Sequence, residues 1–292
     1  MQISNEEYRQ LKPLLFSISY RMLGTVAEAE DIVQETLLKA YQVDEEKIEN
    51  KQAYLCKMVT NRSLDHLRSA RFKREQYVGP WNPEPLLLET MDPDPSELLL
   101  QKEGLSIAYL RMMEHLTPNE RAVLLLRQVF DIPYKEIANI VDKNEENCRK
   151  IFSRAKVKIS RVESESLHYG KNKLIVNRFI DAFQWQKIDT LLELLSENVT
   201  LYSDGGGVVR AAVRPIVSLQ NVSAFLFGVL KKAPKDFAVE VKNVNGQPAI
   251  IIYLNGQLSN IISFFIVNEK IEEIYLTMNP NKLPSLNRVM DI

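Results

Sequence analysis

Residues 28–42 read EAEDIVQETLLKAYQ, and residues 50–74 read NKQAYLCKMVTNRSLDHLRSARFKR. In the first segment, apolar residues recur at helical spacing and predict a helix that faces a core. The predicted core positions are Ala29, Val33, Leu37, Ala40 and Tyr41. The opposite stripe is polar apart from one leucine, and its central members are Asp31, Gln34, Glu35 and Leu38. A leucine within a polar stripe favours a surface that docks on another protein over a merely solvated face.

The second segment predicts a helix that becomes strongly basic toward its end. Arg62, Arg68 and Arg71 stand against a lone acidic residue, Asp65, and this excess of positive charge suits contact with phosphates. Asn61 and Asp65 lie four residues apart, so they share a helix face from which hydrogen-bonding groups can reach bases. A solvated basic helix end is the alternative interpretation.

The two segments together resemble a known family. DIVQETLLKAY (31–41) followed by AYLCKMVTNRSLDHLRS (53–69) is similar to region two of extracytoplasmic-function (ECF) sigma factors. The resemblance implies that the first helix binds core RNA polymerase at the clamp helices of its beta-prime subunit, and that the second helps open and read the minus-ten promoter element. It implies two residue sets: Asp31, Gln34, Glu35 and Leu38 for polymerase, and Asn61, Arg62, Asp65, Arg68 and Arg71 for minus-ten DNA.

Length and composition predict a globular protein of two or three domains. The chain has 292 residues and a formal net charge of −1, so a DNA-binding function must rest on where its charges lie. The only cysteines, Cys56 and Cys148, form no CxxC pair, which fits packing roles in a reducing cytosol. No signal peptide and no apolar run near the roughly 20 residues of a membrane span occur in the sequence. We therefore expect a cytoplasmic protein without membrane partner, metal or cofactor.

A proline-rich linker is predicted at residues 76–96. It contains five prolines, which forbid a continuous helix, and two aromatic residues, Tyr77 and Trp81, that a plain spacer does not need. YVGPWNPEP (77–85) resembles the YVGPWLPEP linker of one sigma-factor group, with Asn82 where leucine is usual. A docked regulatory linker and a bare spacer are both open at this point, and the docking residues would include Gly79 and Pro80.

Residues 97–165 predict a second helical domain that ends in a helix-turn-helix. A helix is predicted over 97–116, and Thr117 with Glu120 forms a capping box for the next one. The tight turn 142–144 precedes a basic helix over 145–160, which would enter the major groove. EIANIVDKNEENCRKIFSRAKVKI (136–159) resembles region four of the same family, which binds the minus-thirty-five element and the beta flap of polymerase. The residues expected to contact DNA are Arg149, Lys150, Ser153 and Arg154.

Residues 171–292 predict an α+β domain. Helices are expected at 171–184, 188–195 and 222–230, with Leu174, Phe179, Ile180 and Phe183 as the core of the first. Strands are expected at 198–204, 237–244, 248–254, 258–267 and 271–278, with a hairpin turn at Asn255–Gly256. Helices against a curved, mostly antiparallel sheet suggest a cone with a pocket at its mouth.

This third domain resembles the SnoaL-like domain of the nuclear-transport-factor-2-like (NTF2-like) superfamily. The stretches that carry the resemblance are DGGG (204–207) and NPNKL (279–283), which are similar to the DGGG and NPDKL sequences of sigma factors with this extension. It implies a multidomain protein with two all-α sigma domains and a regulatory cone. The expected regulatory set in the linker and cone is Tyr77, Gly79, Pro80, Trp81, Asp204, Gly205, Gly206, Gly207, Asn279, Pro280, Lys282 and Leu283.

Three roles are open for Asp204: an interdomain contact, the sensing of a small ligand in the cone pocket, and general-base catalysis. All three histidines precede this domain, so it holds no Asp–His pair. The favoured prediction is a non-enzymatic alternative sigma factor whose fused domain modulates it. The alternatives are a helix-turn-helix regulator that binds operators without polymerase, and a cyclase- or isomerase-like enzyme with a DNA-binding appendage.

Overall fold

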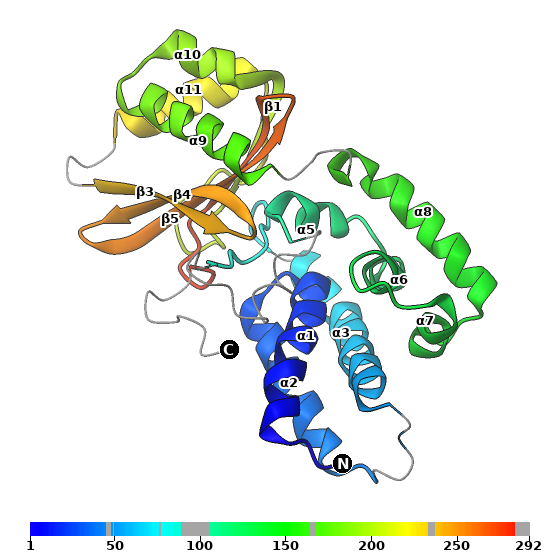
Figure 1. Ribbon diagram of the computed structural model, residues 1–292. Helices are drawn as coiled ribbons and strands as arrows, with labels where there is room; N and C mark the ends of the chain where they lie inside the picture. The colour runs from blue at the N-terminus through cyan, green and yellow to red at the C-terminus, as the bar shows by residue number, and fades with distance from the viewer. Residues whose placement is uncertain are drawn as a thin grey trace.

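The computed structural model describes residues 1–44, 48, 50–75, 77–88, 105–163, 168–232 and 237–283, and only the backbone of 70–75 and 161–163. The predicted linker residues 89–96 and the start of the helix predicted from residue 97 lie outside this description. Two helical units lie side by side, and a sheet covered by further helices lies against them (Figure 1). Among the described residues, no helix is long and apolar enough to cross a membrane.

The first unit consists of α1 (Asn5–Leu23), α2 (Val26–Ala40) and α3 (Lys51–Glu75), which pack pairwise. Gly24 ends α1 because its φ of 73° lies in the left-handed region, which glycine enters without strain. The predicted core face of α2 is confirmed at Ala29, Val33, Leu37 and Ala40, which are all buried. It is wrong at Tyr41, which is 54% exposed because the helix ends one residue earlier.

The second unit consists of α5 (Ile107–Met113), α6 (Pro118–Gln128), α7 (Tyr134–Val141) and α8 (Glu145–Glu163). The predicted capping box at Thr117 and Glu120 is present, and the Asn144 side chain accepts from the Asn147 N–H at 2.8 Å to cap α8. The turn between α7 and α8 passes through Asp142 at a φ of 53°. The helix predicted over 97–116 is wrong at 105–106, because Ser106 is the N-cap of α5, and at 114–116, because α5 ends at Met113.

The third unit is an α+β domain with a six-stranded sheet. Its elements are α9 (Tyr169–Gln184), α10 (Ile188–Leu194), β1 (Leu195–Asp204), β2 (Ile216–Val217), α11 (Leu219–Leu230), β3 (Phe237–Val244), β4 (Gln247–Leu254), β5 (Gln257–Val267) and β6 (Lys270–Thr277). The strand order is β2-β1-β6-β5-β4-β3, and only the β1–β6 pair is parallel. Helices α9, α10 and α11 cover one face (Figure 1).

Two predictions for this domain are wrong in detail. Leu195, expected at the end of the second helix, is instead the first residue of β1. Leu174, expected in the core of α9, is 66% exposed, and its neighbours Ile175 and Val176 are buried instead. The other face of the sheet joins the helical units, because Phe265 and Tyr275 belong to the same buried apolar cluster as residues of α1–α3 and α5–α8. The three units therefore meet in one buried apolar cluster, whereas α9–α11 and the face of the sheet that they cover form a separate core.

Candidate functional site

The docking stripe predicted on α2 lies on the surface. Asp31, Gln34, Glu35 and Leu38 are all exposed, and Leu38 has 59% of its surface in contact with solvent. The stripe therefore combines carboxylates, an amide and one accessible apolar side chain on a single helix face. This composition suits a protein partner more than a nucleic acid, because the negative charges repel phosphates.

The set predicted to bind DNA on α3 lies directly beside this stripe. Asn61 and Arg62 are half-buried, whereas Asp65 and Arg68 are exposed. Arg62 forms an ion pair with Glu35 of the stripe, and the Arg68 guanidinium donates to Asp65 Oδ1 at 2.9 Å. Exposed ion pairs of this kind contribute little stability, so they can exchange for contacts to a partner. The side chain of Arg71 lies outside the described residues.

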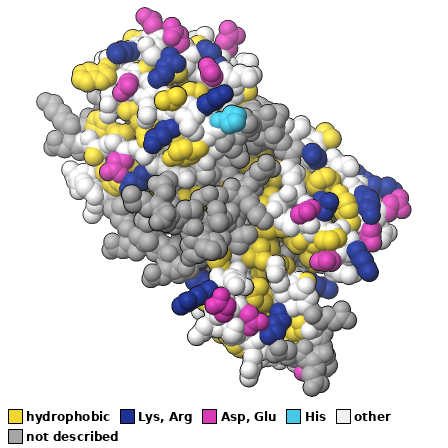
Figure 2. Space-filling model, in the orientation of Figure 1, with side chains coloured by type: hydrophobic (Ala, Val, Ile, Leu, Met, Phe, Trp, Pro, Cys, Tyr) yellow, Lys and Arg dark blue, Asp and Glu magenta, His cyan; other side chains and the backbone are white. Residues whose placement is uncertain are grey.

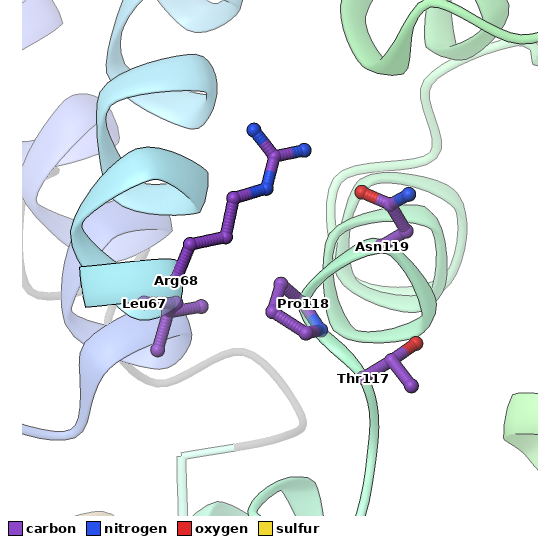
Figure 3. Close-up of a pocket in the computed structure, with 5 residues that line it drawn as sticks. All are labelled: Leu67, Arg68, Thr117, Pro118 and Asn119. Carbon is purple, nitrogen blue, oxygen red and sulfur yellow. The ribbon is translucent and has the colours of Figure 1, made fainter. Parts of the chain in front are cut away.

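A cavity of about 250 Å³ lies between α3 and α6. Figure 3 shows Leu67 and Arg68 on α3 facing Thr117, Pro118 and Asn119 at the start of α6. The two helical units thus meet next to the basic face of α3.

A buried arginine secures this contact between the units. Arg121 of α6 is 4% exposed, and its guanidinium donates to the backbone oxygens of Met22 in the first unit and Met113 in its own unit, the latter at 2.8 Å. It also pairs with Glu114 at 3.0 Å. A buried charge that bonds to both units fixes how the two units sit against each other.

The DNA-contact set predicted on α8 is exposed. It comprises Arg149, Lys150, Ser153 and Arg154. Arg149 and Lys150 pair with Glu145 and Glu146 at 2.9 and 2.6 Å, each one turn earlier on the same helix. Figure 2 shows basic and acidic side chains interspersed on the part of the surface where Figure 1 places α8. This face can bind phosphates once the lysine and arginine exchange their carboxylate partners for DNA.

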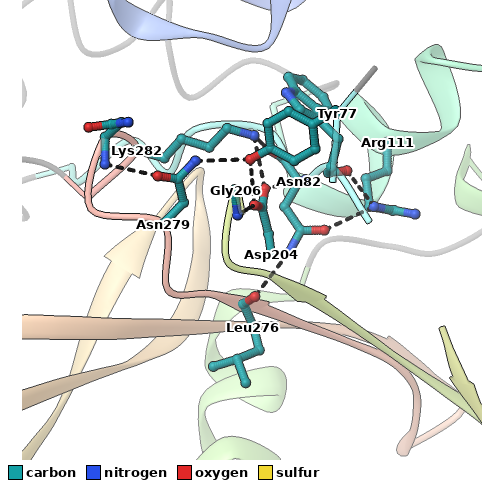
Figure 4. Close-up of polar contacts among 10 residues, drawn as sticks. Tyr77, Asn82, Arg111, Asp204, Gly206, Leu276, Asn279 and Lys282 are labelled. Atoms are coloured by element: carbon teal, nitrogen blue, oxygen red, sulfur yellow. Dashed lines mark hydrogen bonds and ion pairs between the residues drawn. The ribbon is translucent and has the colours of Figure 1, made fainter. Parts of the chain in front are cut away.

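The linker docks on a buried carboxylate of the third unit, Asp204, at the end of β1. Asp204 is fully buried and accepts hydrogen bonds from Tyr77 Oη at 2.6 Å, Asn82 N at 2.8 Å and Gly206 N at 3.1 Å (Figure 4). Lys282 is 6% exposed, and its Nζ lies 2.9 Å from Asp204 Oδ2. Burial and then the adjacent carboxylate raise the pKa of Tyr77, which keeps the phenol protonated as a donor.

The linker also contacts α5 through Arg111. The Arg111 guanidinium donates to Trp81 O at 2.6 Å and to Asn82 Oδ1 at 2.9 Å, and it lies 3.9 Å from the centre of the Tyr202 ring of β1. Asn82 is fully buried and also donates to Leu276 O. Sequence reasoning missed Arg111 as a site residue, because an arginine on an amphipathic helix carries no signal of this contact.

The last described residues of the linker add to the edge of the sheet. Leu87 forms an antiparallel β-bridge with Val244 of β3, and Leu88 N donates to Asn243 O at 3.0 Å. The Leu87 side chain packs on a small buried cluster that Leu283 also contacts. This cluster consists of Val244, Ala249, Ile251 and Ile261. The linker is thus held in part by main-chain hydrogen bonds, as in strand addition.

Three of the predicted glycines, Gly79 (φ 84°), Gly206 and Gly207, have backbone conformations that favour glycine. A Cβ on Gly206 (φ 61°) would lie 2.2 Å from Asn279 Nδ2, and one on Gly207 (φ 73°) would lie 3.3 Å from Val78 of the linker. Asn279 Nδ2 in turn donates to Tyr77 Oη at 2.9 Å. Of the remaining predicted members, Gly79 lies against Val213, Gly205 lies against Val209, Pro80 is half-buried and Pro280 is exposed.

Comparison with known proteins matches both helical units to families. The model of Sigma-70 region 2 matches residues 7–73, and that of Sigma-70 region 4 matches residues 106–159. The ECF RNA polymerase sigma factor SigJ of Mycobacterium tuberculosis is 32% identical over 253 residues, which cover 85% of this chain and 80% of SigJ. This chain belongs to the ECF sigma factors. The probable ECF sigma factor SigI of the same organism is 28% identical over 96% of this chain and 94% of its own length.

A solved structure shows that the similarity to an ECF sigma factor also covers the third unit of this chain. The crystal structure of M. tuberculosis SigJ matches with a TM-score of 0.78 and 26% identity, covering 96% of this chain and 98% of that one. Region 2 therefore corresponds to α1–α3 and region 4 to α5–α8, and the α+β sheet domain is an extension that the SigJ structure shares.

Family membership settles the broad function. ECF sigma factors direct RNA polymerase to promoters and are not enzymes, so the enzyme alternative is wrong. The regulator that binds operators without polymerase is wrong for the same reason. Asp204 is fully occupied by protein donors in this sigma factor.

Proposed function

We propose that the NTF2-like domain of this sigma factor controls initiation by holding the linker and, with it, regions 2 and 4 in one compact arrangement. The observation that carries the proposal is the buried Asp204 carboxylate, which takes hydrogen bonds from Tyr77 and from the backbone of Asn82. A fold usually leaves a linker in solvent. Here a carboxylate and an ammonium group are withdrawn from water to hold it.

The proposed domains are residues 1–75, the linker 76–96, 97–165 and 171–292. Region 2 binds the clamp helices of the beta-prime subunit through Asp31, Gln34, Glu35 and Leu38, and region 4 contacts the beta flap. The proposed minus-ten contacts are Asn61, Arg62, Asp65, Arg68 and Arg71, and the proposed minus-thirty-five contacts are Arg149, Lys150, Ser153 and Arg154. The protein would act in the cytoplasm, where polymerase and promoter DNA meet. In these sets every described side chain is exposed apart from Asn61 and Arg62, which are half-buried, and this accessibility supports these assignments.

The compact arrangement opposes promoter binding for a geometric reason. The minus-ten and minus-thirty-five elements lie about 25 base pairs apart, or roughly 85 Å at about 3.4 Å per base pair. In this structure the two regions touch, since Arg68 of α3 and Pro118 of α6 line one cavity. Both regions can engage one straight promoter only after they separate. A linker tied to region 2, to α5 and to the sheet opposes that separation.

The test is run-off transcription with core polymerase at saturating concentration, with genomic fragments supplying the promoter. We expect Asp204→Ala to initiate faster than the wild-type chain, because the linker loses its buried acceptor. Asp181→Ala is the control, since Asp181 is an exposed aspartate on α9 of the same domain. An unchanged rate would show that the domain does not modulate initiation. A slower rate would show that linker docking supports initiation instead of restraining it.

The cone pocket and its small ligand stay a prediction. A ligand that competes with the linker for Asp204 or Lys282 would be the simplest signal for release, because both groups are charged and already desolvated. Its class would be small and polar.

A further inference from the structure

We propose that Glu84 of the linker is a positioning residue for polymerase binding, because it caps the N-terminus of α2. The inference rests on the proposed function of α2 as the polymerase-docking helix. It adds a second role for the docked linker: it completes the helix that polymerase contacts.

The N-terminus of α2 is not capped by its own N-cap residue. Thr25 stands at that position with extended backbone angles, yet its side chain makes no capping hydrogen bond. Its hydroxyl donates instead to Glu28 Oε2 at 2.6 Å. The first backbone N–H of the helix, that of Val26, donates to Glu84 Oε2 at 2.7 Å. A carboxylate from 58 residues farther along the chain thus satisfies a donor that the helix cannot satisfy itself.

The backbone of Glu84 holds the carboxylate in place. Glu84 N donates to Gly24 O at 2.8 Å, and Glu84 O accepts from Tyr20 Oη at 2.6 Å. Trp81 covers the same turn, since a Cβ on Gly24 would lie 2.8 Å from its ring. The segment from Trp81 to Glu84 therefore encloses the α1–α2 turn, and the charge sits where the partial positive charge of the helix terminus favours it.

The same segment contacts the NTF2-like domain on its other side. Asn82 N donates to Asp204, and the Asn245 side chain donates to Tyr20 Oη at 2.7 Å, so the domain supports both the linker and the tyrosine that holds Glu84. The cap is therefore complete when the linker is docked. Linker docking and polymerase binding are then coupled, and each stabilises the other by the same factor.

The test measures the affinity of the full-length chain for core polymerase in the absence of DNA, by fluorescence anisotropy of labelled chain. We expect Glu84→Ala to weaken binding about fivefold, the usual effect of losing a helix cap. Glu84→Gln, which keeps an acceptor but loses the charge, should weaken binding about twofold to threefold. Glu6→Gln is the matched control, because Glu6 lies in the first turn of α1 and is exposed.

A rescue variant separates the cap from a general packing role. Thr25→Asp places a strong capping residue at the N-cap position, whose backbone is already extended. In the Glu84→Ala background it should restore polymerase affinity to within about twofold of wild type, although it restores no linker contact. Failure of this rescue, or wild-type affinity in Glu84→Ala, would overturn the inference.

Leu38→Ala tests the underlying proposal separately. If Leu38→Ala weakens polymerase binding and Glu84→Ala does not, α2 remains the docking helix and only the proposed role of the Glu84 cap is refuted. Unchanged binding by Leu38→Ala would instead remove the docking stripe, and the role of Glu84 in polymerase binding would fall with it.

Discussion

Removing one partner of the buried pair between Asp204 and Lys282 should destabilise the docked linker strongly. Removing both partners should cost less free energy than the sum of the two single changes. Asp204→Ala leaves the Lys282 ammonium desolvated, and it leaves Tyr77 Oη and Asn82 N without their acceptor. Breaking a buried pair costs about 3–5 kcal/mol, and each unsatisfied buried donor adds roughly 1–3 kcal/mol when it cannot reach water. We expect a loss of at least about 5 kcal/mol for this change, which is the sum of the lower bounds of these terms.

Lys282→Met should cost less, about 2–3 kcal/mol. The Asp204 carboxylate then keeps three donors, and the methionine side chain fills much of the space of the lysine stem. The lost contacts are the bond to Asn82 O at 2.6 Å and the position of the ammonium 4.2 Å from the Trp81 ring centre. The double variant Asp204→Ala/Lys282→Met removes both charges, so it should lie within about 1 kcal/mol of Asp204→Ala alone.

The assay uses one of the two tryptophans as a reporter. Trp185 is 73% exposed on the third unit, so Trp185→Phe leaves Trp81 as the single tryptophan, which contacts Gly24 in region 2. Urea titrations followed by Trp81 fluorescence then report linker release, and far-UV circular dichroism reports unfolding of the helices. If the double variant loses the sum of the two single losses, the pair has no coupling energy and our reasoning about the network is refuted.

Three further predictions follow from single sites. Gly24→Ala should lower stability by about 1–2 kcal/mol, because φ is 73° and Trp81 lies 2.8 Å from the new Cβ; Gly228→Ala, with open space inside α11, should instead be neutral or stabilising in the same thermal melts. Burial raises the pKa of the Cys56 thiol to about 12 from about 9. The buried thiol therefore contributes to the free energy of unfolding below about pH 9, and this contribution is lost as the pH rises toward 12. Cys56→Ala should reduce the fall of the free energy of unfolding between about pH 9 and 12, measured by denaturant titration. Arg154→Ala should reduce the slope of log affinity against log salt for promoter DNA by about 0.9 if the side chain binds one phosphate, and an unchanged slope would remove it from the contact set.

The elements that the sequence predicted well are those with strong local signals. The strand over Phe237–Val244 was predicted with its observed bounds, and its half-buried and exposed positions alternate as in a strand with two different faces. The turn at Asn255–Gly256 has positive φ at both residues, which is what this dipeptide permits. The two-residue strand β2 was missed, since two residues carry no periodicity.

The errors and omissions share a physical cause. Tyr41 continues the apolar spacing of α2 but lies beyond its last turn, and Leu174 occupies a helical phase that the neighbouring strands do not cover. Tyr77, Gly206 and Lys282, three of the network partners of Asp204, could be named from the resemblance, but Arg111 and Asn245 could not. Their contacts join residues 29–30 and 140–225 positions apart, and such pairings depend on how whole domains pack.

The two proposals for the linker act in opposite directions on initiation, and this opposition gives an order of events. A docked linker caps α2 through Glu84 and so favours polymerase binding. The same docked linker keeps regions 2 and 4 in contact and so opposes their placement on a promoter. If both hold, the compact form binds polymerase first, and linker release follows when promoter contacts or polymerase contacts on α2 compensate for the lost cap. Asp204→Ala separates the two steps: it should raise the initiation rate at saturating polymerase and also raise the polymerase concentration needed for half-maximal initiation. A change in only one of these two quantities would show that the linker acts on one step alone.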